Sequence, residues 1–340
     1  MTATEQEPDP AVLMAEYVKN RGDIFEEWHF MAKYVPLTIA KLHDTAGYIL
    51  QNDNKSTPDQ ELSVVFRELI ALCQLSAKGD LRFAANHVRR LYRFGITNAV
   101  IFEAAESFAP VVGHASIALV AQAILLANDP AYPFGKMPEG GEPSQLKPFP
   151  EMTMGWTADR DVPQSLLQEP EWQYAAEIDP ELARRTASFV DHCLTDRRPG
   201  RVLSPGAREL IAIAALCARG QVDLAATHIR RAYAYGFSRR KVLEAISCVQ
   251  NMTGAVSVLL GIRAMQQADH AGHEEDRDEH RHERDRDGED REAHLLRADD
   301  RGLERVHAAL DVAHDVLEHH HRVVHDQAHR EGDPEKRHVV

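Results

Sequence analysis

Apolar residues recur every three or four positions along most of the first 265 residues, which is the spacing of one face of an α-helix. The pattern is clearest in FRELIALCQLSA (66–77), FAANHVRRLYRF (83–94) and AVIFEAAESFA (99–109). No stretch shows the sustained alternation of apolar and polar residues that a half-buried strand requires. The chain therefore predicts an all-α fold.

Turn and capping residues divide this pattern into separate helices. Thr57-Pro58-Asp59-Gln60 is typical of a capping box and predicts a helix start. Gly79 breaks the first helix above from the second. Gly95 stands where a left-handed C-terminal cap belongs, and Thr97 then offers an N-cap to the third helix. We expect short antiparallel helices joined by tight turns.

The same arrangement occurs twice in the chain. Residues 67–124 align with 208–265 at an offset of 141 without a gap, and 21 of the 58 pairs are identical. Upstream the offset is 144, where Trp28 pairs with Trp172 and Pro36 with Pro180. A shared helical pattern alone does not give so many matches in register. The sequence predicts two copies of one helical unit related by a pseudo-twofold axis.

Composition then sets the domain boundaries. Residues 1–128 and 164–267 hold the two helical domains. Residues 129–163 are rich in proline and form a connection that is either extended or wrapped over one domain, because its aromatic side chains would otherwise be exposed. Residues 268–340 are a charged, low-complexity tail rich in His, Arg, Asp and Glu, which favours disorder or a short helix.

The tail has an unusual composition from residue 266 onward. It contains no Ser, Thr, Ile, Phe, Tyr, Trp, Asn, Cys or Met, and it carries 13 of the 19 His. One hypothesis is out-of-frame translation of a GC-rich gene, because all but one of its residues have a codon that starts with G or C. The alternative is a metal-binding tract, since His-rich stretches bind nickel or zinc.

Charge and cysteine usage narrow the class of protein. The net charge is −14, but the tail holds −10 of it, and the near-neutral body gives no reason to expect a nucleic-acid partner. No apolar run is long enough to span a membrane, and no signal peptide is visible. The four cysteines are widely spaced. These features predict a cytoplasmic protein with reduced thiols.

Each copy holds a Glu and a His that are 19 residues apart, Glu68 with His87 and Glu209 with His228. In an antiparallel pair turning at Gly79, Glu68 and His87 lie about 16 Å and 12 Å from the turn, so a hydrogen bond between them is within reach. The pair is either a structural strut in the core or a general acid–base pair able to move protons near neutral pH.

Adjacent arginines follow each His. Because neighbours on a helix face different ways, one of each pair is a candidate for binding an anionic substrate, and the alternative is a solvated face or a salt bridge. His114 in the first copy has Ala255 as its counterpart, which makes the two sites chemically unequal and favours the first as the active one. The candidate substrate-binding residues are therefore Arg89, Arg90, Arg230, Arg231 and His114.

The order and spacing of these residues resemble the carboxymuconolactone decarboxylase and alkylhydroperoxidase-D-like family over about residues 20–125 and 165–265. The resemblance implies two tandem all-helical domains, a pseudo-dimer within the chain and a homo-oligomer. The peroxidase branch of the family uses a Cys-x-x-Cys pair before the His. Asp80 and Phe83, and Gln221 and Leu224, occupy those positions here, so thiol redox chemistry is not expected.

The decarboxylase branch that remains needs no cofactor and no metal. The sequence favours a lyase or isomerase acting on a small carboxylate or lactone, with His87 or His228 as proton donor and Glu68 or Glu209 tuning it. That branch is typically rich in acidic and aromatic residues just before the His, whereas GDLRFAANH and GQVDLAATH have only Asp80 and Asp223 as acidic residues, at different positions. They argue against the family's archetypal lactone as substrate. The rival hypotheses are a non-catalytic helical binding or assembly protein, and a degenerate peroxidase-like protein without thiol activity.

Overall fold

A computed structural model describes residues 7–21, 25–50, 60–131, 148–154, 156, 170–248 and 250–286, with side chains up to Ala271 apart from Asn20 and Arg21. Residues 1–272 form one compact unit, and the text below concerns that unit unless it says otherwise. The all-α prediction is confirmed, since the described residues contain helices and no strand. None of the helices in the described ranges is long and apolar enough to cross a membrane.

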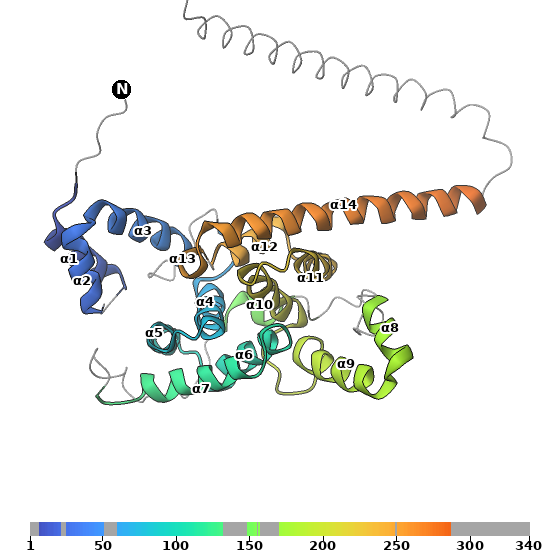
Figure 1. The fold of residues 1–340 in the computed structure, drawn as a ribbon, viewed down its shortest axis with the longest axis horizontal. Helices are drawn as coiled ribbons and strands as arrows, with labels where there is room; N and C mark the ends of the chain where they lie inside the picture. Colours follow the sequence, from blue (N-terminus) through green and yellow to red (C-terminus); the bar gives the residue numbers. More distant parts are fainter. Residues whose placement is uncertain are drawn as a thin grey trace, which may run out of the picture. The chain divides into compact units, whose positions relative to one another are not determined.

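The described residues of the first half form helices, including those that the periodicity predicts over 66–77, 83–94 and 99–109 (Figure 1). They are α1 (Pro10–Arg21), α2 (Glu26–Tyr34), α3 (Pro36–Ile49), α4 (Val64–Lys78), α5 (Leu81–Arg93), α6 (Asn98–Val112) and α7 (Ala115–Ala127). A short 3₁₀ turn, η1 (Pro150–Met152), lies in the connection. The second half holds α8 (Pro170–Ile178), α9 (Pro180–Leu194), α10 (Pro205–Ala218), α11 (Val222–Ala234), α12 (Arg239–Ser247), α13 (Gln250–Thr253) and α14 (Ala255–Arg286).

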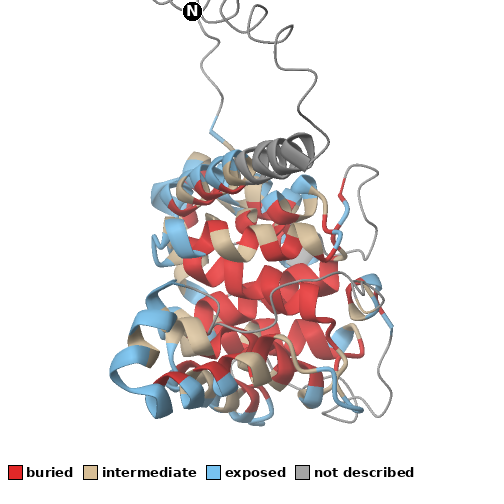
Figure 2. Cartoon of the chain, turned by 90° about the vertical axis from the view of Figure 1, so that its right-hand side faces the viewer, coloured by how far each residue is buried: buried red, intermediate tan, exposed pale blue. Residues whose placement is uncertain are grey.

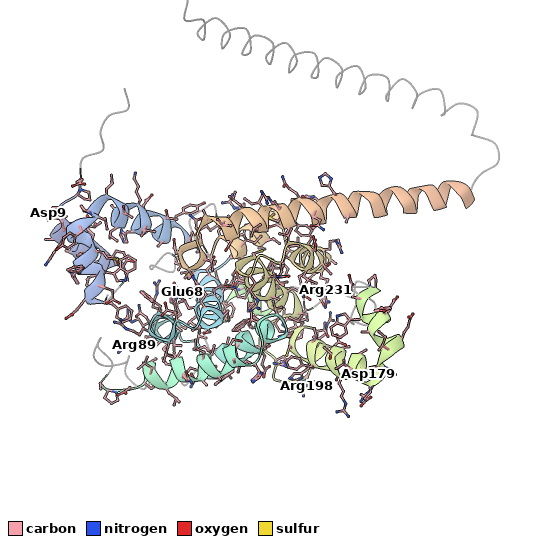
Figure 3. All side chains as sticks on the ribbon, in the orientation of Figure 1. Asp9, Glu68, Arg89, Asp179, Arg198 and Arg231 are labelled. Carbon is pink, nitrogen blue, oxygen red and sulfur yellow. The ribbon has the colours of Figure 1, made fainter. Side chains whose placement is uncertain are left out.

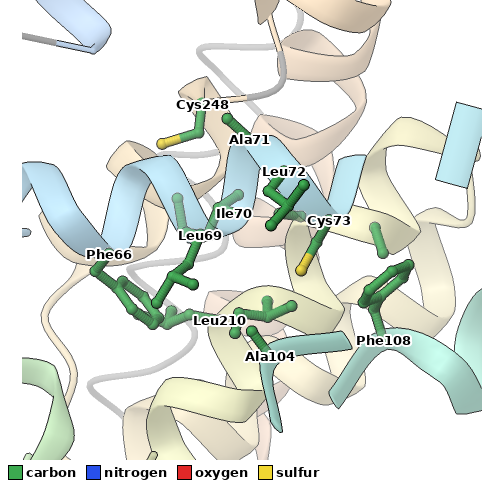
Figure 4. Close-up of a cluster of buried hydrophobic side chains, with 14 of the residues drawn as sticks. Phe66, Leu69, Ile70, Ala71, Leu72, Cys73, Ala104, Phe108, Leu210 and Cys248 are labelled. Carbon is green, nitrogen blue, oxygen red and sulfur yellow. The ribbon is translucent and has the colours of Figure 1, made fainter. Parts of the chain in front are cut away.

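The two halves share one hydrophobic core, built around α4 and α10. These helices pack against each other, and each also contacts α6 and α12. Buried residues fill the middle of the unit (Figure 2), and Leu69 and Phe66 of α4 lie close to Leu210 of α10 in Figure 4. Every residue of α4 from Val64 to Ser76 is buried. The central helix α4 is therefore buried on all sides over this stretch, as expected for a helix surrounded by others.

Capping side chains fix where the central helices begin. Ser63 Oγ accepts a hydrogen bond from the backbone N–H of Phe66, and Ser204 Oγ accepts one from Ala207. The capping box expected at residues 57–60 is wrong as a helix start. Gln60 is not helical and α4 begins only at Val64, while residues 57–59 lie outside the described ranges. A serine at the N-cap supplies the same hydrogen bond later in the chain.

The turn between α4 and α5, like the one between α10 and α11, uses a glycine as predicted. Gly79 and Gly220 adopt φ values of 83° and 73°, in the left-handed region that side chains disfavour. Each reverses the chain so that α5 runs back along α4 and α11 along α10. This turn sets the register between the two helices of each pair.

Two glutamates tie the halves together in a reciprocal way. Glu103 of α6 accepts hydrogen bonds from the backbone N–H groups of Val202 and Leu203, at 2.7 and 2.9 Å, just before α10. Glu244 of α12 does the same for Glu61 and Leu62, at 3.0 and 2.8 Å, just before α4. Because residues 103 and 244 correspond at the offset of 141, the two halves exchange the same contact.

Part of the proline-rich connection enters the core. Glu151 is fully buried, and its carboxylate accepts hydrogen bonds from both the backbone N–H and the hydroxyl of Ser63, each at 2.7 Å. Its backbone carbonyl accepts a hydrogen bond from Ser204 Oγ at 3.3 Å. Phe149 beside it is buried in the shared core. One residue of the connection therefore reaches the N-caps of both central helices.

The helix α14 continues well past the second repeat. Ala264 and Ala268 are buried in the shared core, and Asp269 pairs with Arg239 at 3.0 Å. The first 19 residues of the segment expected as a tail, 268–286, are helical. The rest of that segment, residues 287–340, falls outside the described ranges.

Candidate functional site

The α4–α5 pair brings Glu68 and His87 together, as the spacing predicts. His87 Nδ1 lies 2.6 Å from Glu68 Oε2. The α10–α11 pair repeats the contact, with His228 Nδ1 at 2.5 Å from Glu209 Oε2. Both glutamate side chains are completely buried. The distances are those of strong hydrogen bonds to a carboxylate, so Nδ1 carries the shared proton and Nε2 is the ring nitrogen free to exchange a proton with a ligand.

An arginine joins the Glu and the His of each half, and the three residues together form a Glu–His–Arg unit. Arg90 Nη2 lies 2.7 Å from Glu68 Oε1, and Arg231 Nε lies 2.8 Å from Glu209 Oε1. Glu68 and Arg231, one from each unit, are labelled in Figure 3. The positive charge compensates the buried carboxylate, which would otherwise be costly to bury. Each Glu therefore serves as a fixed, ionised anchor for its His.

The charges around Glu209 determine its ionisation. Burial alone raises the pKa of this carboxyl group, but Arg231, His228 and the hydrogen bond from His228 together bring the pKa below its ordinary value. Glu209 is therefore a carboxylate at neutral pH and holds its His in the Nδ1–H tautomer.

A cavity of about 230 Å³ opens beside His87. Helices of both halves line it, since most of its wall comes from α1 to α5 and the remainder from α13. At about 30 Å³ for one water in the liquid, it has room for a small metabolite rather than a large coenzyme. Its lining residues are Tyr17, Trp28, Leu42, Ala46, Leu50, Leu75, Lys78, Asp80, Phe83, His87, Asn251 and Met252.

Aromatic rings form one wall of this cavity. The ring centroids of Tyr17 and Trp28 are 5.3 Å apart, and Trp28 meets Phe83 edge-on at 6.5 Å. Phe25 packs edge-on against Phe83 at 5.1 Å, and the Arg82 guanidinium lies 4.0 Å over the Phe25 ring. Edge-to-face contacts of this kind fix ring orientation. The wall therefore offers aromatic surface suited to a planar or apolar ligand.

Three polar groups accompany His87 in the cavity. Lys78, at the last turn of α4, has no ion-pair partner within the described part of the chain. Asp80 is the N-cap of α5, and its side chain accepts a hydrogen bond from the backbone N–H of Phe83 at 3.2 Å. The Asn251 Nδ2 group is buried and has no hydrogen-bond partner among the residues described. The cavity thus offers one cation and one unsatisfied donor to a ligand.

The second unit has different surroundings. His228 lines neither this cavity nor the other cavity described below. Leu224, the counterpart of Phe83, is 56% exposed, and no residue of α8 is buried. The same Glu–His–Arg group therefore lies beside an aromatic-walled cavity in the first half and beside an exposed leucine in the second.

The other predicted site residues lie apart from the cavity beside His87. Arg89 is buried on α5, and Arg230 donates a hydrogen bond to Thr227 Oγ1 at 3.3 Å. His114 is exposed at the start of α7. Arg90 and Arg231 bind the glutamates of their own units. None of the five predicted binding residues lines the cavity, where Lys78 supplies the positive charge.

All four cysteines are buried and reduced. Burial raises the pKa of the Cys193 thiol to about 11 and that of Cys217 to about 12, and it raises the pKa of Cys73 and Cys248 further. A protonated, buried thiol is a poor nucleophile. No cluster of three potential metal ligands occurs within the described ranges.

Sequence reasoning missed most of the cavity wall. Three lining residues, Lys78, Asp80 and Phe83, stand within about one helical turn of Gly79 in the repeated motif. The spacing could therefore have placed Lys78 and Phe83 on the side of His87. Tyr17, Trp28 and Asn251 carry no such signal, because they reach the cavity only through the packing of α1, α2 and α13.

A crystal structure from Burkholderia xenovorans LB400, of a protein proposed to be a gamma-carboxymuconolactone decarboxylase subunit, is 20% identical over 78% of this chain and 100% of the other, with a TM-score of 0.49. No curated protein matches the chain. Residues 180–266, in the second copy, match the model of the carboxymuconolactone decarboxylase family. The match covers 87 of the 340 residues, so it is this segment of the chain that is similar to the family.

Proposed function

We propose that this protein is a cofactor-free lyase or isomerase that acts on a small carboxylate or lactone in the cavity beside His87. The observation that carries the proposal is the position of His87, which lines an apolar cavity while Glu68 holds its Nδ1 at 2.6 Å. A His fixed by a carboxylate and facing a ligand space is the arrangement that general acid–base catalysis requires.

The residues of the cavity have separate roles in such a reaction. Lys78 binds one carboxylate of the substrate, and the buried Asn251 amide donates to a carbonyl oxygen. Apolar neighbours such as Leu42 and Leu75 desolvate a second carboxylate, which favours its loss as CO₂. The electron pair of the broken C–C bond passes into the conjugated carbonyl as a dienolate.

Protonated His87 then donates its Nε2 proton to carbon and becomes neutral. Glu68 stays ionised because Arg90 pairs with it, and it keeps the Nδ1–H in place throughout. An isomerase would use the same group in both directions, first taking a proton from carbon and then returning it elsewhere. No step needs a metal, a thiol or a redox partner.

The assembly of the protein belongs to the same proposal. Glu103 and Glu244 exchange equivalent contacts between the halves, and this supports two tandem domains acting as a pseudo-dimer within one chain. We expect such chains to form homo-oligomers in the cytoplasm, as the family resemblance implies. The first copy is proposed as the active one, because its His has the enclosed cavity.

A non-catalytic role is the second candidate. It is favoured by the second unit, where Glu209, His228 and Arg231 make the same contacts without lining either cavity. That unit suggests that the network also stabilises helix pairs. In this case the His of the first copy would likewise be a structural strut.

Matched His→Gln substitutions separate the two functions. The purified protein is incubated with a panel of small carboxylated lactones and unsaturated keto acids in D₂O, and NMR follows the loss of substrate and deuterium incorporation. We expect His87→Gln to reduce turnover by about 100-fold or more with little loss of folded protein, and His228→Gln to retain activity.

Circular dichroism melting on the same variants provides the control. Equal loss of activity from both substitutions would contradict an active first copy. If both variants unfold and the native protein turns over no member of the panel, the structural role is favoured instead. A buried Glu left without its partner costs about 1–3 kcal/mol.

A further inference from the structure

A second and larger cavity lies between the two halves, at the start of α4, whereas the cavity beside His87 lies at the end of that helix. Its volume is about 440 Å³. The first half contributes the end of α3 and the start of α4, and the second half contributes α12 and α14. Its lining residues are Tyr48, Ile49, Gln60, Arg67, Arg239, Arg240, Leu243, Glu244, Ser247 and Met265.

The unusual feature of this cavity is the Arg67 guanidinium. Arg67 is only 1% exposed. Its Nη1 donates to the carbonyl of Ile49 at 2.5 Å and its Nε to the carbonyl of Ser63 at 3.4 Å. Its Nη2 is buried and has no hydrogen-bond partner, and no carboxylate pairs with Arg67 among the described residues. A buried cation without a counter-charge is costly, so this nitrogen has a strong preference for an acceptor.

Arg208, the corresponding residue of the second half, has a carbonyl acceptor for each of its three guanidinium nitrogens. Arg208 donates to the carbonyl oxygens of Leu203, Cys193 and Asp196, and Glu103 Oε1 lies 3.9 Å away. The residue that would match Asp196 falls in 51–59, outside the described ranges. Of these two arginines, Arg67 is the one that keeps a donor without a hydrogen-bond partner among the described residues.

Nearby charges leave that donor available. Glu244 is the carboxylate of the cavity, and it already accepts from the backbone of Glu61 and Leu62 and from Arg240 at 3.1 Å. Arg239 pairs with Asp269 near the surface. Three arginines stand against Glu244 and the Asp269 that pairs with Arg239, so the charges named here leave an excess of one positive charge, which favours an anion.

The remaining groups define the kind of anion. Gln60 Nε2 donates to the carbonyl of Tyr48 at 2.5 Å, and its Oε1 is buried and accepts nothing from the described residues. The ligand must therefore also carry a hydrogen-bond donor. Ile49, Leu243 and Met265 supply apolar surface. A single available guanidinium nitrogen suits one carboxylate better than a phosphate, which needs several donors.

We propose that the cavity between α3, α4, α12 and α14 binds a small organic anion that carries a carboxylate and a hydroxyl on an apolar body. The carboxylate binds Arg67 Nη2, the hydroxyl donates to Gln60 Oε1, and the apolar body packs on Leu243 and Met265. This site uses none of the residues that line the cavity beside His87, so its test does not depend on the proposed reaction.

Three matched probes test the proposal on the full chain by calorimetric titration. Mandelate has the carboxylate, the hydroxyl and an apolar ring. Phenylacetate lacks the hydroxyl, and mandelamide lacks the charge. We expect saturable binding of mandelate, affinity at least tenfold weaker for phenylacetate, and no detectable binding of mandelamide. The absence of saturable mandelate binding, or equal binding of mandelate and mandelamide, would overturn the proposal.

Variants that leave Arg67 in place locate the bound mandelate. Gln60→Glu adds a carboxylate that competes for the arginine, and Leu243→Trp fills the cavity. Both should reduce mandelate affinity at least tenfold while the protein stays folded by circular dichroism. Arg263→Gln, at an exposed position of α14, changes the net charge by the same amount as Gln60→Glu. This control variant should bind mandelate with the affinity of the native protein. Unchanged affinity in both cavity variants would place the mandelate elsewhere and refute the site.

Discussion

At the scale of single residues, the same chemical group occurs in two environments. Glu68 with His87 and Glu209 with His228 have nearly the same geometry, at 2.6 and 2.5 Å. What differs is the neighbour one turn before each His, Phe83 in a closed aromatic wall and Leu224 at the surface. The pair sets the protonation of the imidazole, and the neighbours decide whether a ligand can use it.

The ionisation of Glu209 predicts a pH dependence of stability. Its pKa in the folded protein lies below the ordinary value of 4.5. A lowered pKa means that the carboxylate contributes stability above the ordinary value, and that this contribution disappears as the pH falls through the lowered pKa. We expect Glu209→Gln to be clearly less stable than the native protein at pH 7, with the difference shrinking in acid.

Thermal melting of the two proteins between neutral pH and about pH 3 checks this. The exposed Glu181→Gln serves as control, because its side chain is 53% exposed and solvent screens its pairing with Arg184 and Arg185 on the same helix. A stability difference for Glu209→Gln that stays constant from neutral pH into acid would contradict the assigned ionisation.

Burial of the thiols predicts the absence of thiol peroxidase activity. All four cysteine pKa values are raised, and Asp80 and Phe83 stand where a redox pair would be. We expect no peroxide consumption in the presence of dithiol reductants, and slow labelling of the native protein by a disulfide reagent compared with the unfolded chain. Peroxide turnover that disappears in Cys73→Ser or Cys217→Ser would overturn this.

At the scale of helices, local rules predicted the central hairpins well. Gly79 and Gly220 turn the chain as expected, and the 19-residue spacing brings Glu and His together because both distances are fixed by helix geometry. The start of α4 was misplaced, since Thr57-Pro58-Asp59-Gln60 has the composition of a cap but Ser63 makes the actual contact. Composition alone does not say which of two nearby polar residues will cap a helix.

The cavity wall could not be predicted from those rules. Tyr17, Trp28 and Asn251 reach His87 from α1, α2 and α13, which are distant in sequence and packed by tertiary contacts. Neither periodicity nor spacing contains that information. The repeat indicated which residues correspond between halves, but not that the second half would complete a cavity of the first.

Glu151 connects the two central helices and predicts a large effect of one substitution. Its carboxylate holds both the N–H and the hydroxyl of Ser63. Removing it leaves a helix N-terminus with unsatisfied groups in a buried place, which costs about 2–3 kcal/mol for hydrogen bonds to a charged partner. We expect Glu151→Ala to lower the melting temperature by several degrees.

A matched control is Glu181→Ala, which removes an exposed carboxylate and should leave the melting temperature nearly unchanged. Differential scanning calorimetry of both variants measures the effect. If Glu151→Ala melted within one degree of the native protein, the connection would not be part of the stabilising core.

At the scale of the whole molecule, one core extends through both halves of the described helical unit. Core residues come from α4, α6, α10, α12 and α14 together, and the reciprocal glutamates connect each half to the loop of the other. Neither half alone buries the full surface of its central helix. We therefore expect the two halves to unfold in one cooperative transition rather than separately.

Two truncations test where this core ends. Deleting residues 268–340 removes the buried Ala268 and the Asp269–Arg239 pair at 3.0 Å, whereas deleting 287–340 removes none of the described contacts. We expect the shorter deletion to melt like the full chain and the longer one to melt a few degrees lower, since about 1 kcal/mol shifts the midpoint by roughly 2–4 °C at this size.

Arg239→Gln in the full chain isolates the ion pair, which is largely exposed and should contribute little. If the shorter deletion also lowered the midpoint by several degrees, residues beyond 286 would pack on the helical unit. If both deletions melted like the full chain, the end of α14 would contribute nothing to the core in which Ala268 is buried.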